Sequence, residues 1–248
     1  RKNYNLTIVL ILVLILLIFI VSKKENFVNT KLDNPGFGSR SGTKEVGINF
    51  KNKYGTFFTQ CTQKHRDMIK KILKKHKNTI FVEIGVFGGA TLFDIYDLCK
   101  KNYIEIYGID PHDKLNIWNG INIENVPTNI VSRTHKRNKK FRENIQNSIK
   151  KNNLDINYIN DFSWDVYKSF KDSSISVLHI DGDHSYESVL KDLNLFYPKM
   201  KKNGVIIMDD YGWTPVKKAI RHFKKNNPNI KIEELRVGNQ MGCLIHIN

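Results

Sequence analysis

The chain has little cysteine for its length. Its three cysteines, Cys61, Cys99 and Cys243, are odd in number and far apart, and no C-x-x-C pair is present. This pattern excludes a disulfide scaffold and a cysteine-based zinc site, and it favours a reducing compartment. With 248 residues the chain is long enough for one domain with a substantial core and an additional segment.

Acidic residues are also scarce: 24 stand against 40 basic residues, which gives a formal net charge of +16. A charge of this size can attract nucleic acid, an anionic membrane surface or an acidic substrate. The basic runs, such as KKILKKHKN and HKRNKKFREN, lack interleaved aromatic residues and match no nucleic-acid-binding motif. We therefore interpret them as solvated faces and expect no nucleic-acid partner.

The first 22 residues differ in composition from the rest. Leu6–Val21 is a run of sixteen residues with no charge and one hydroxyl, Thr7. A membrane-spanning helix needs about 20 apolar residues, and Tyr4 and Ser22 can extend the run into the interface. The alternative is a signal peptide, but the run is followed by SKKENF, which contains no A-x-A-like cleavage site. We predict an uncleaved, single-pass transmembrane anchor over residues 1–22.

Contact with the membrane would be made through residues 6–21. More lysines and arginines follow this run than precede it, so the positive-inside rule places the following domain in the cytoplasm. Residues 23–58 are polar and contain NPGFGSRSG at 34–42, and we expect a linker there. A folded domain is predicted over residues 59–248.

Residues 79–110 hold two apolar strands joined by a glycine-rich turn and an amphipathic helix. The turn contains three glycines, Gly85, Gly88 and Gly89. Glycines let the backbone approach a ligand closely, and an acid that ends the second strand, here Asp110, can accept a ribose hydroxyl pair. The spacing E-x-G-x-x-x-G differs from G-x-G-x-x-G, so the dinucleotide fingerprint is not met. We interpret the unit as a nucleoside site, and Glu83 before the turn suits a ligand with a cationic amino-acid tail.

The alternation of strands and helices continues along the chain. Further apolar strands are predicted at Ile156–Asn160, Ile175–Asp181 and Gly204–Asp209, with helices between them. Residues 112–132 show neither the helical nor the strand period of apolar residues, and we expect a loop there that covers the substrate. A basic helix is predicted to follow over Arg133–Lys151.

The chain ends in two strands, Ile230–Val237 and Gly242–Ile247, separated by a short connection that contains Gly-Asn-Gln. So short a connection predicts a hairpin, in which the last strand runs antiparallel to its neighbour. The predicted fold class is α/β: a Rossmann-like, doubly wound seven-stranded sheet with an antiparallel last strand, preceded by the transmembrane helix. Ligands of such sheets bind beyond the carboxyl ends of the strands.

Acidic residues lie at the carboxyl ends of the predicted parallel strands. These are Glu83, Asp110, Asp161, Asp181, Asp209 and Asp210. Carboxylates that converge on one edge repel each other unless a cation or ligand hydroxyls compensate them. We therefore expect the functional site at this edge.

Two segments are more specific. Residues 177–186 read VLHIDGDHSY, and residues 205–211 read VIIMDDY. Together they resemble a group of class I S-adenosylmethionine (SAM)-dependent methyltransferases that act on sugar hydroxyls of macrolides and related small molecules, and the glycine turn is similar to the first motif of that class. The resemblance covers roughly residues 60–247. It implies an O-methyltransferase whose substrate is a hydroxylated small molecule or sugar.

The resemblance also implies a metal site. In the macrolide-sugar and catechol-type enzymes, the residues that match Asp181, Asp209 and Asp210 hold Mg²⁺, which prefers oxygen ligands. Three carboxylates leave positions for two substrate oxygens, so vicinal hydroxyls are the natural target, and the metal would lower the hydroxyl pKa. Asp183 is an alternative ligand to Asp181.

For the catalytic base the resemblance leaves two candidates. His184 lies where catechol-type enzymes place a lysine base, and a histidine with an ordinary pKa of ~6.5 could serve. Asp181 is the other candidate, as the sugar-modifying relatives suggest. Alternatively, His184 faces solvent at the start of the following helix.

The cofactor residues implied by the resemblance are Glu83, Gly85, Gly89, Asp110, Asp161 and Ser163. The first three would enclose the methionine end of SAM, Asp110 would accept the ribose hydroxyls, and the last two would flank the adenine. Phe162 would either stack on the adenine or belong to the core.

Two other functions were weighed. A hydroxylase-type relative on the same fold would need an iron site with histidine ligands, but only His184 lies near the motif. A catalytically silent, membrane-tethered binding module would not need acids at each strand end. The remaining histidines have no ligand spacing and are interpreted as incidental: His65, His76, His112, His135, His179, His222 and His246.

Overall fold

The structure is a computed structural model that describes residues 48–114, 117–118, 121–122, 128–237 and 240–248. The predicted anchor over residues 1–22 and the predicted linker up to residue 47 lie outside the described residues. No helix in the described ranges combines the length and the apolar character needed to cross a membrane.

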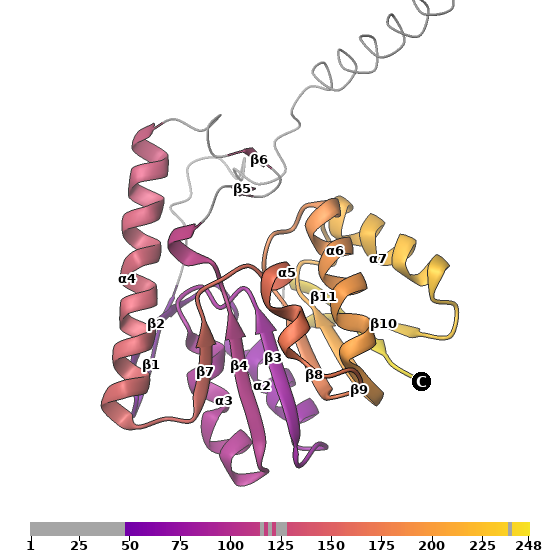
Figure 1. The fold of residues 1–248 in the computed structure, drawn as a ribbon, viewed down its shortest axis with the longest axis horizontal. Helices are drawn as coiled ribbons and strands as arrows, with labels where there is room; N and C mark the ends of the chain where they lie inside the picture. The colour runs from indigo at the N-terminus through magenta and orange to yellow at the C-terminus, as the bar shows by residue number, and fades with distance from the viewer. Residues whose placement is uncertain (1–47, 115–116, 119–120, 123–127, 238–239) are drawn as a thin grey trace, which may run out of the picture. The chain divides into compact units, whose positions relative to one another are not determined.

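A seven-stranded sheet forms the centre of the domain, with the strand order β10-β11-β9-β8-β3-β4-β7 (Figure 1). Its strands are β3 (Thr79–Ile84), β4 (Ile104–Ile109), β7 (Ile156–Ile159), β8 (Ile175–Ile180), β9 (Met200–Met208), β10 (Lys231–Val237) and β11 (Gln240–His246). The five neighbouring strands β9, β8, β3, β4 and β7 pair in parallel, whereas β11 is antiparallel to both β9 and β10. The predicted sheet and its antiparallel last strand are therefore confirmed.

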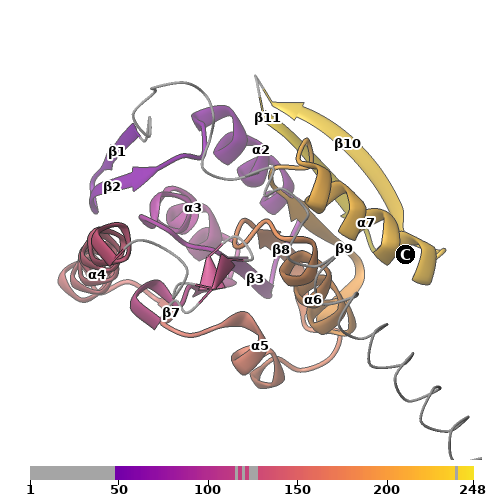
Figure 2. The ribbon, with the colours of Figure 1, turned by 90° about the horizontal axis from the view of Figure 1, so that it is seen from above.

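Helices cover both faces of this sheet (Figure 2). They are α2 (Gln63–Leu73), α3 (Ala90–Lys101), α4 (Thr128–Asn152), α5 (Ser163–Val166), α6 (Tyr186–Phe196) and α7 (Thr214–Asn226), with short 3₁₀ turns at His112–Lys114, Tyr167–Ser169 and Tyr197–Lys199. Successive strand residues point to opposite faces, so Phe81 packs in the core under α2 and α3, and its neighbour Val82 packs in the core under α6 and α7. A central strand such as β8 is consequently buried along its whole length.

The predicted linker is wrong at its end, because β1 (Ile48–Asn52) and β2 (Gly55–Thr59) form an antiparallel hairpin. Phe57 is fully buried, and its ring stacks on Phe93 of α3 with 3.8 Å between the ring centroids. The hairpin strands are too short to give a clear hydrophobic alternation, and they depend on packing against the helices.

The expected covering loop over residues 112–132 is also shorter than predicted. Helix α4 begins at Thr128, before the predicted start at Arg133. The two-residue strands β5 (Ile117–Trp118) and β6 (Ile121–Asn122) pair within the segment that precedes it.

Candidate active site

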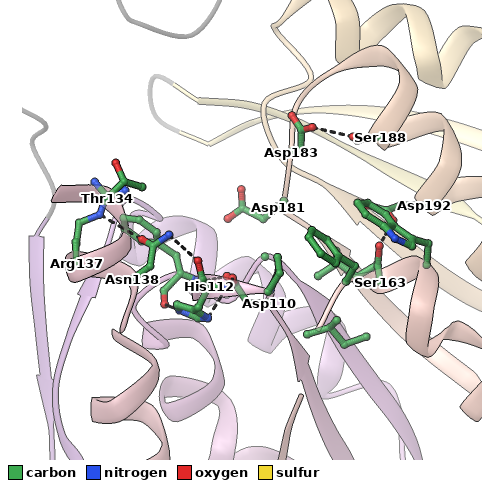
Figure 3. Close-up of a pocket in the computed structure, with 18 residues that line it drawn as sticks. Asp110, His112, Thr134, Arg137, Asn138, Ser163, Asp181, Asp183, Ser188 and Asp192 are labelled. Carbon is green, nitrogen blue, oxygen red and sulfur yellow. Dashed lines mark hydrogen bonds and ion pairs between the residues drawn. The ribbon is translucent and has the colours of Figure 1, made fainter. Parts of the chain in front are cut away.

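A cavity of about 210 Å³ opens at the carboxyl ends of the parallel strands (Figure 3). Gly85 of the glycine turn lines it, together with Asp110 after β4 and Asp181 after β8. Gly85 has φ +88°, and a Cβ at this position would lie 2.1 Å from the carbonyl oxygen of Asp181. Only glycine fits there, and the turn can therefore lie against the end of β8.

Asp110 is held at the cavity wall by two backbone groups. Its Oδ2 accepts from the N–H of Phe87 at 2.8 Å, and its Oδ1 accepts from the N–H of His112 at 2.8 Å. Both donors belong to residues with positive φ, +50° at Phe87 and +33° at His112. The turn after β3 and the turn after β4 are thus joined through one carboxylate, which keeps further lone pairs for a ligand.

His112 is structurally important, contrary to its interpretation as incidental. The side chain is buried, with Nε2 2.6 Å from the carbonyl oxygen of Phe87 and Nδ1 2.7 Å from the hydroxyl of Tyr158. No ligand spacing along the chain marks His112, because its role depends on the two turns meeting in space.

Helix α4 forms one side of the cavity through Thr134, Arg137 and Asn138. Asn138 Nδ2 donates to the carbonyl oxygen of His112 at 3.0 Å, which fixes the helix against the turn after β4. These residues are spaced by three and four positions and share one helix face. The sequence analysis treated this helix only as a basic segment and missed the contribution.

At the opposite side, Ser163 and Phe162 line the cavity. Their predicted place beside the adenine stays a prediction. Asp161 does not line it: its Oδ2 accepts from Lys114 Nζ at 3.0 Å, and its Oδ1 accepts from the N–H of Phe162 at 3.0 Å. The hydroxyl of Ser163 donates to Asp192, a residue of α6 that the sequence analysis did not single out. The ring of Phe162 stacks on Trp164.

Asp192 is buried, and burial raises the pKa of its carboxyl from 3.8 to about 7 despite the hydrogen bond from Ser163. Because the folded state holds this proton more tightly than the unfolded state, the free energy of unfolding should fall as the pH rises from about 4 to about 7.

Asp192→Asn should therefore become more stable than the wild type across this window, by up to about 4 kcal/mol above pH 7. Urea unfolding at several pH values between 4 and 8 measures this difference. The exposed Asp165→Asn serves as the control and should show no such trend. A stability difference between Asp192→Asn and the wild type that does not change with pH would contradict the prediction.

Glu83 lies beneath the cavity and not in its wall. It is buried, and its Oε1 is 2.9 Å from Nδ1 of His179 on the neighbouring strand β8. Burial raises the pKa of Glu83, whereas His179 opposes the shift. His65 of α2 lies in the same buried layer, with its ring centroid 5.4 Å from that of His179 and its Nδ1 3.7 Å from Asp209 Oδ1. Neither histidine is incidental, because each contacts a buried strand-end acid.

Asp181, Asp209 and Asp210 come together at the ends of β8 and β9, as the sequence predicted, and His184 lies among them. His184 Nε2 is 3.1 Å from Asp210 Oδ2 and 3.8 Å from Asp181 Oδ1. Burial raises the pKa of Asp181 well above its ordinary value, and the charges of Asp209, Asp210 and Glu83 raise it further.

The pKa of His184 is shifted by the same cluster. Burial lowers this pKa, but the neighbouring carboxylates, Asp210 foremost and then Asp209 and Asp183, together raise it above its ordinary value. The ring also packs near Trp213, with 5.1 Å between the ring centroids. His184 is therefore held inside the site and does not face solvent at the helix start.

Among the residues that the structure describes, no group of three or more His, Cys, Asp or Glu side chains is arranged to hold a metal ion. The side chain of Asp209 accepts from the N–H of Asp210 at 2.8 Å, and that of Asp210 faces His184. The donor chemistry of these carboxylates nevertheless suits a hard cation, since all the ligands on offer are oxygens.

Residues 82–211 match the sequence model of a family described as "Methyltransferase domain". This match extends over more than half of the chain. The chain belongs to this methyltransferase family. The methyltransferase is also 32% identical over 142 residues to the uncharacterized protein R132 of Acanthamoeba polyphaga mimivirus, and the aligned part is 54% of each chain. It therefore spans about half the length of this relative.

Solved structures resemble the methyltransferase in fold. The O-methyltransferase NovP matches over 75% of this chain and 80% of its own, with a TM-score of 0.58 and 18% identity. The O-methyltransferase from Bacillus cereus in complex with S-adenosylhomocysteine (SAH) matches over 75% and 82%, with a TM-score of 0.53 and 12% identity. The family match shows a methyltransferase domain, as the strand-end motifs predicted, and the fold of these solved structures agrees with it.

Proposed function

We propose that this methyltransferase transfers the methyl group of SAM to a hydroxyl oxygen of a small molecule or sugar. The observation that carries the proposal is the position of His184, which lies between Asp210 and Asp181 directly beside the cofactor cavity. A basic nitrogen held by a carboxylate at this place can remove a hydroxyl proton. Two solved structures with this fold are O-methyltransferases, which supports the same acceptor atom.

In the proposed reaction the hydroxyl oxygen attacks the methyl carbon, the carbon–sulfur bond of SAM breaks, and its electrons remain on sulfur as SAH forms. The hydroxyl proton passes to the imidazole of His184, which acts in its neutral form. Asp210, whose Oδ2 lies 3.1 Å from the buried Nε2, stabilises the imidazolium that results. Asp181 lines the cavity, and its Oδ1 lies 3.8 Å from Nε2 of His184.

We further propose that Asp181, Asp209 and Asp210 hold Mg²⁺. The repulsion that raises the pKa of Asp181 supports this assignment, because a cation would relieve it. When bound, the ion would lower the pKa of the acceptor hydroxyl and help to orient it. A substrate with vicinal hydroxyls follows from this proposal.

Binding of SAH tests the cofactor site directly. Asp110→Ala should weaken SAH binding roughly tenfold to a hundredfold, because it removes charge-assisted hydrogen bonds to the ribose and frees the two turns that the carboxylate joins. Isothermal titration calorimetry on the wild type and the variant measures the change. Asp155→Ala, which removes an exposed acid before β7, is the matched control and should bind as the wild type. Equal affinities for all three proteins would refute the assignment of Asp110.

The membrane anchor is a separate proposal that rests on the apolar run at residues 6–21. The full chain should remain in the membrane fraction after an alkaline carbonate wash, and a variant without residues 1–22 should be released. Immunoblots of the two fractions measure this distribution. A product cleaved just after residue 22 would instead establish a signal peptide.

A further inference from the structure

Asp192 is a buried carboxylate in the cofactor cavity whose presence the methyl-transfer chemistry does not explain. It projects from α6, is 4% exposed, and lines the cavity beside Ser163 and Trp164. Figure 3 shows it on the side of Ser163, across the cavity from Thr134, Arg137 and Asn138, with Asp110 between the two sides.

A buried acid costs stability unless a partner compensates it. The hydrogen bond that the structure gives Asp192 comes from the hydroxyl of Ser163, a neutral donor. Burial and the charge of nearby Asp183 disfavour its ionised form, and the charge of Lys191 only partly offsets them. The ammonium of Lys191 lies 3.8 Å from the centre of the Trp164 ring. The presence of an acid at this point is therefore best explained by a ligand that donates a hydrogen bond to it.

The acid expected at the adenine end does not fill this role. Asp161 is engaged by Lys114 and by the N–H of Phe162, and it does not line the cavity. The adenine end of the cavity nevertheless has a flat apolar wall, since Phe162 and Trp164 both line it and stack on each other with 4.5 Å between ring centroids. A purine edge placed against this wall would reach Ser163 and Asp192, which come next along the same side.

We propose that Asp192 selects adenine by accepting a hydrogen bond from the 6-amino group of SAM, with Ser163 holding the carboxylate in place. The assignment rests on SAM occupying this cavity. It makes Asp192 a cofactor-specificity residue supplied by α6, in place of the acid that follows β7.

A cycle that removes either the amino group or the carboxylate tests this contact. The ligands are SAH and its analogue with hydrogen in place of the 6-amino group, titrated by calorimetry into the full chain. The wild type should prefer SAH roughly tenfold to a hundredfold, as for a hydrogen bond to a charged group. Asp192→Ala should bind the two ligands within about threefold of each other, because the acceptor is gone.

Two further variants separate recognition from folding. Asp192→Asn keeps the shape of the side chain and a partner for Ser163, and it too should lose most of the preference, because its carbonyl is neutral. The exposed Asp165→Ala should keep the full preference of the wild type.

A preference for SAH that stays equal in the wild type, Asp192→Ala and Asp192→Asn would overturn the inference about Asp192 and leave the cofactor site intact. A wild type that binds neither ligand would overturn the inference together with the assignment of the cavity to SAM. A preference lost in Asp192→Asn, whose fold is retained by thermal unfolding, would establish it.

Discussion

Replacing His184 with alanine is expected to slow methyl transfer by about a hundredfold to ten-thousandfold, the usual contribution of a positioned base. SAH affinity should stay within about twofold, because His184 does not line the cofactor cavity. The physical reason is the geometry of the cluster: Nε2 of the imidazole lies 3.1 Å from Asp210 Oδ2 and 3.8 Å from Asp181 Oδ1, which places the ring where the hydroxyl proton would be taken up.

Transfer of a labelled methyl group from SAM to a vicinal-diol acceptor, under single-turnover conditions, measures the rate. His76→Ala, a half-buried histidine that follows α2, is the control and should react as the wild type. If His184→Ala retains the wild-type rate while Asp181→Asn loses it, then Asp181 is the base and His184 only fills the space between the acids.

The sheet could be predicted because its determinants are local. Each parallel strand is an apolar run that ends in an acid, as at Glu83 and Asp181, and a short Gly-Asn-Gln connection requires an antiparallel partner. The hairpin of β1 and β2 could not be predicted in this way. The hairpin is held mainly by one buried residue, Phe57, whose ring stacks on Phe93 of α3. This contact joins distant segments, so the local sequence does not predict it.

The position of the site could also be predicted from local determinants, whereas the roles of its side chains could not, because they depend on contacts between distant segments. Strand ends must meet at one edge of a parallel sheet, so the convergence of Asp110, Asp181 and Asp209 followed from the topology. What each side chain does there depends on contacts between distant segments. Asp161 accepts a hydrogen bond from Lys114, and Asp192 lines the cavity from α6, where Ser163 donates to it. No residue spacing in the sequence predicts either contact.

Replacing Asp209 and Asp210 together with asparagine should abolish methyl transfer, with a rate loss of roughly a thousandfold or more. The double variant removes two of the three carboxylates proposed to hold Mg²⁺ and also the charge that orients His184. SAH binding should survive, because neither residue lines the cofactor cavity. The fold should survive as well, since the substitution relieves the repulsion that acts on Asp181.

The role of the metal is separated from that of the charges by chelation. EDTA should inactivate the wild type, and added Mg²⁺ should restore the wild type but not the double variant. His184 bears on the outcome, because its Nε2 lies 3.1 Å from the Asp210 carboxylate, which would stabilise the imidazolium formed when the ring takes up the hydroxyl proton. If wild-type turnover is undiminished in EDTA while the double variant stays inactive, the acids act through His184 and not through a metal ion, and the proposed Mg²⁺ site is wrong.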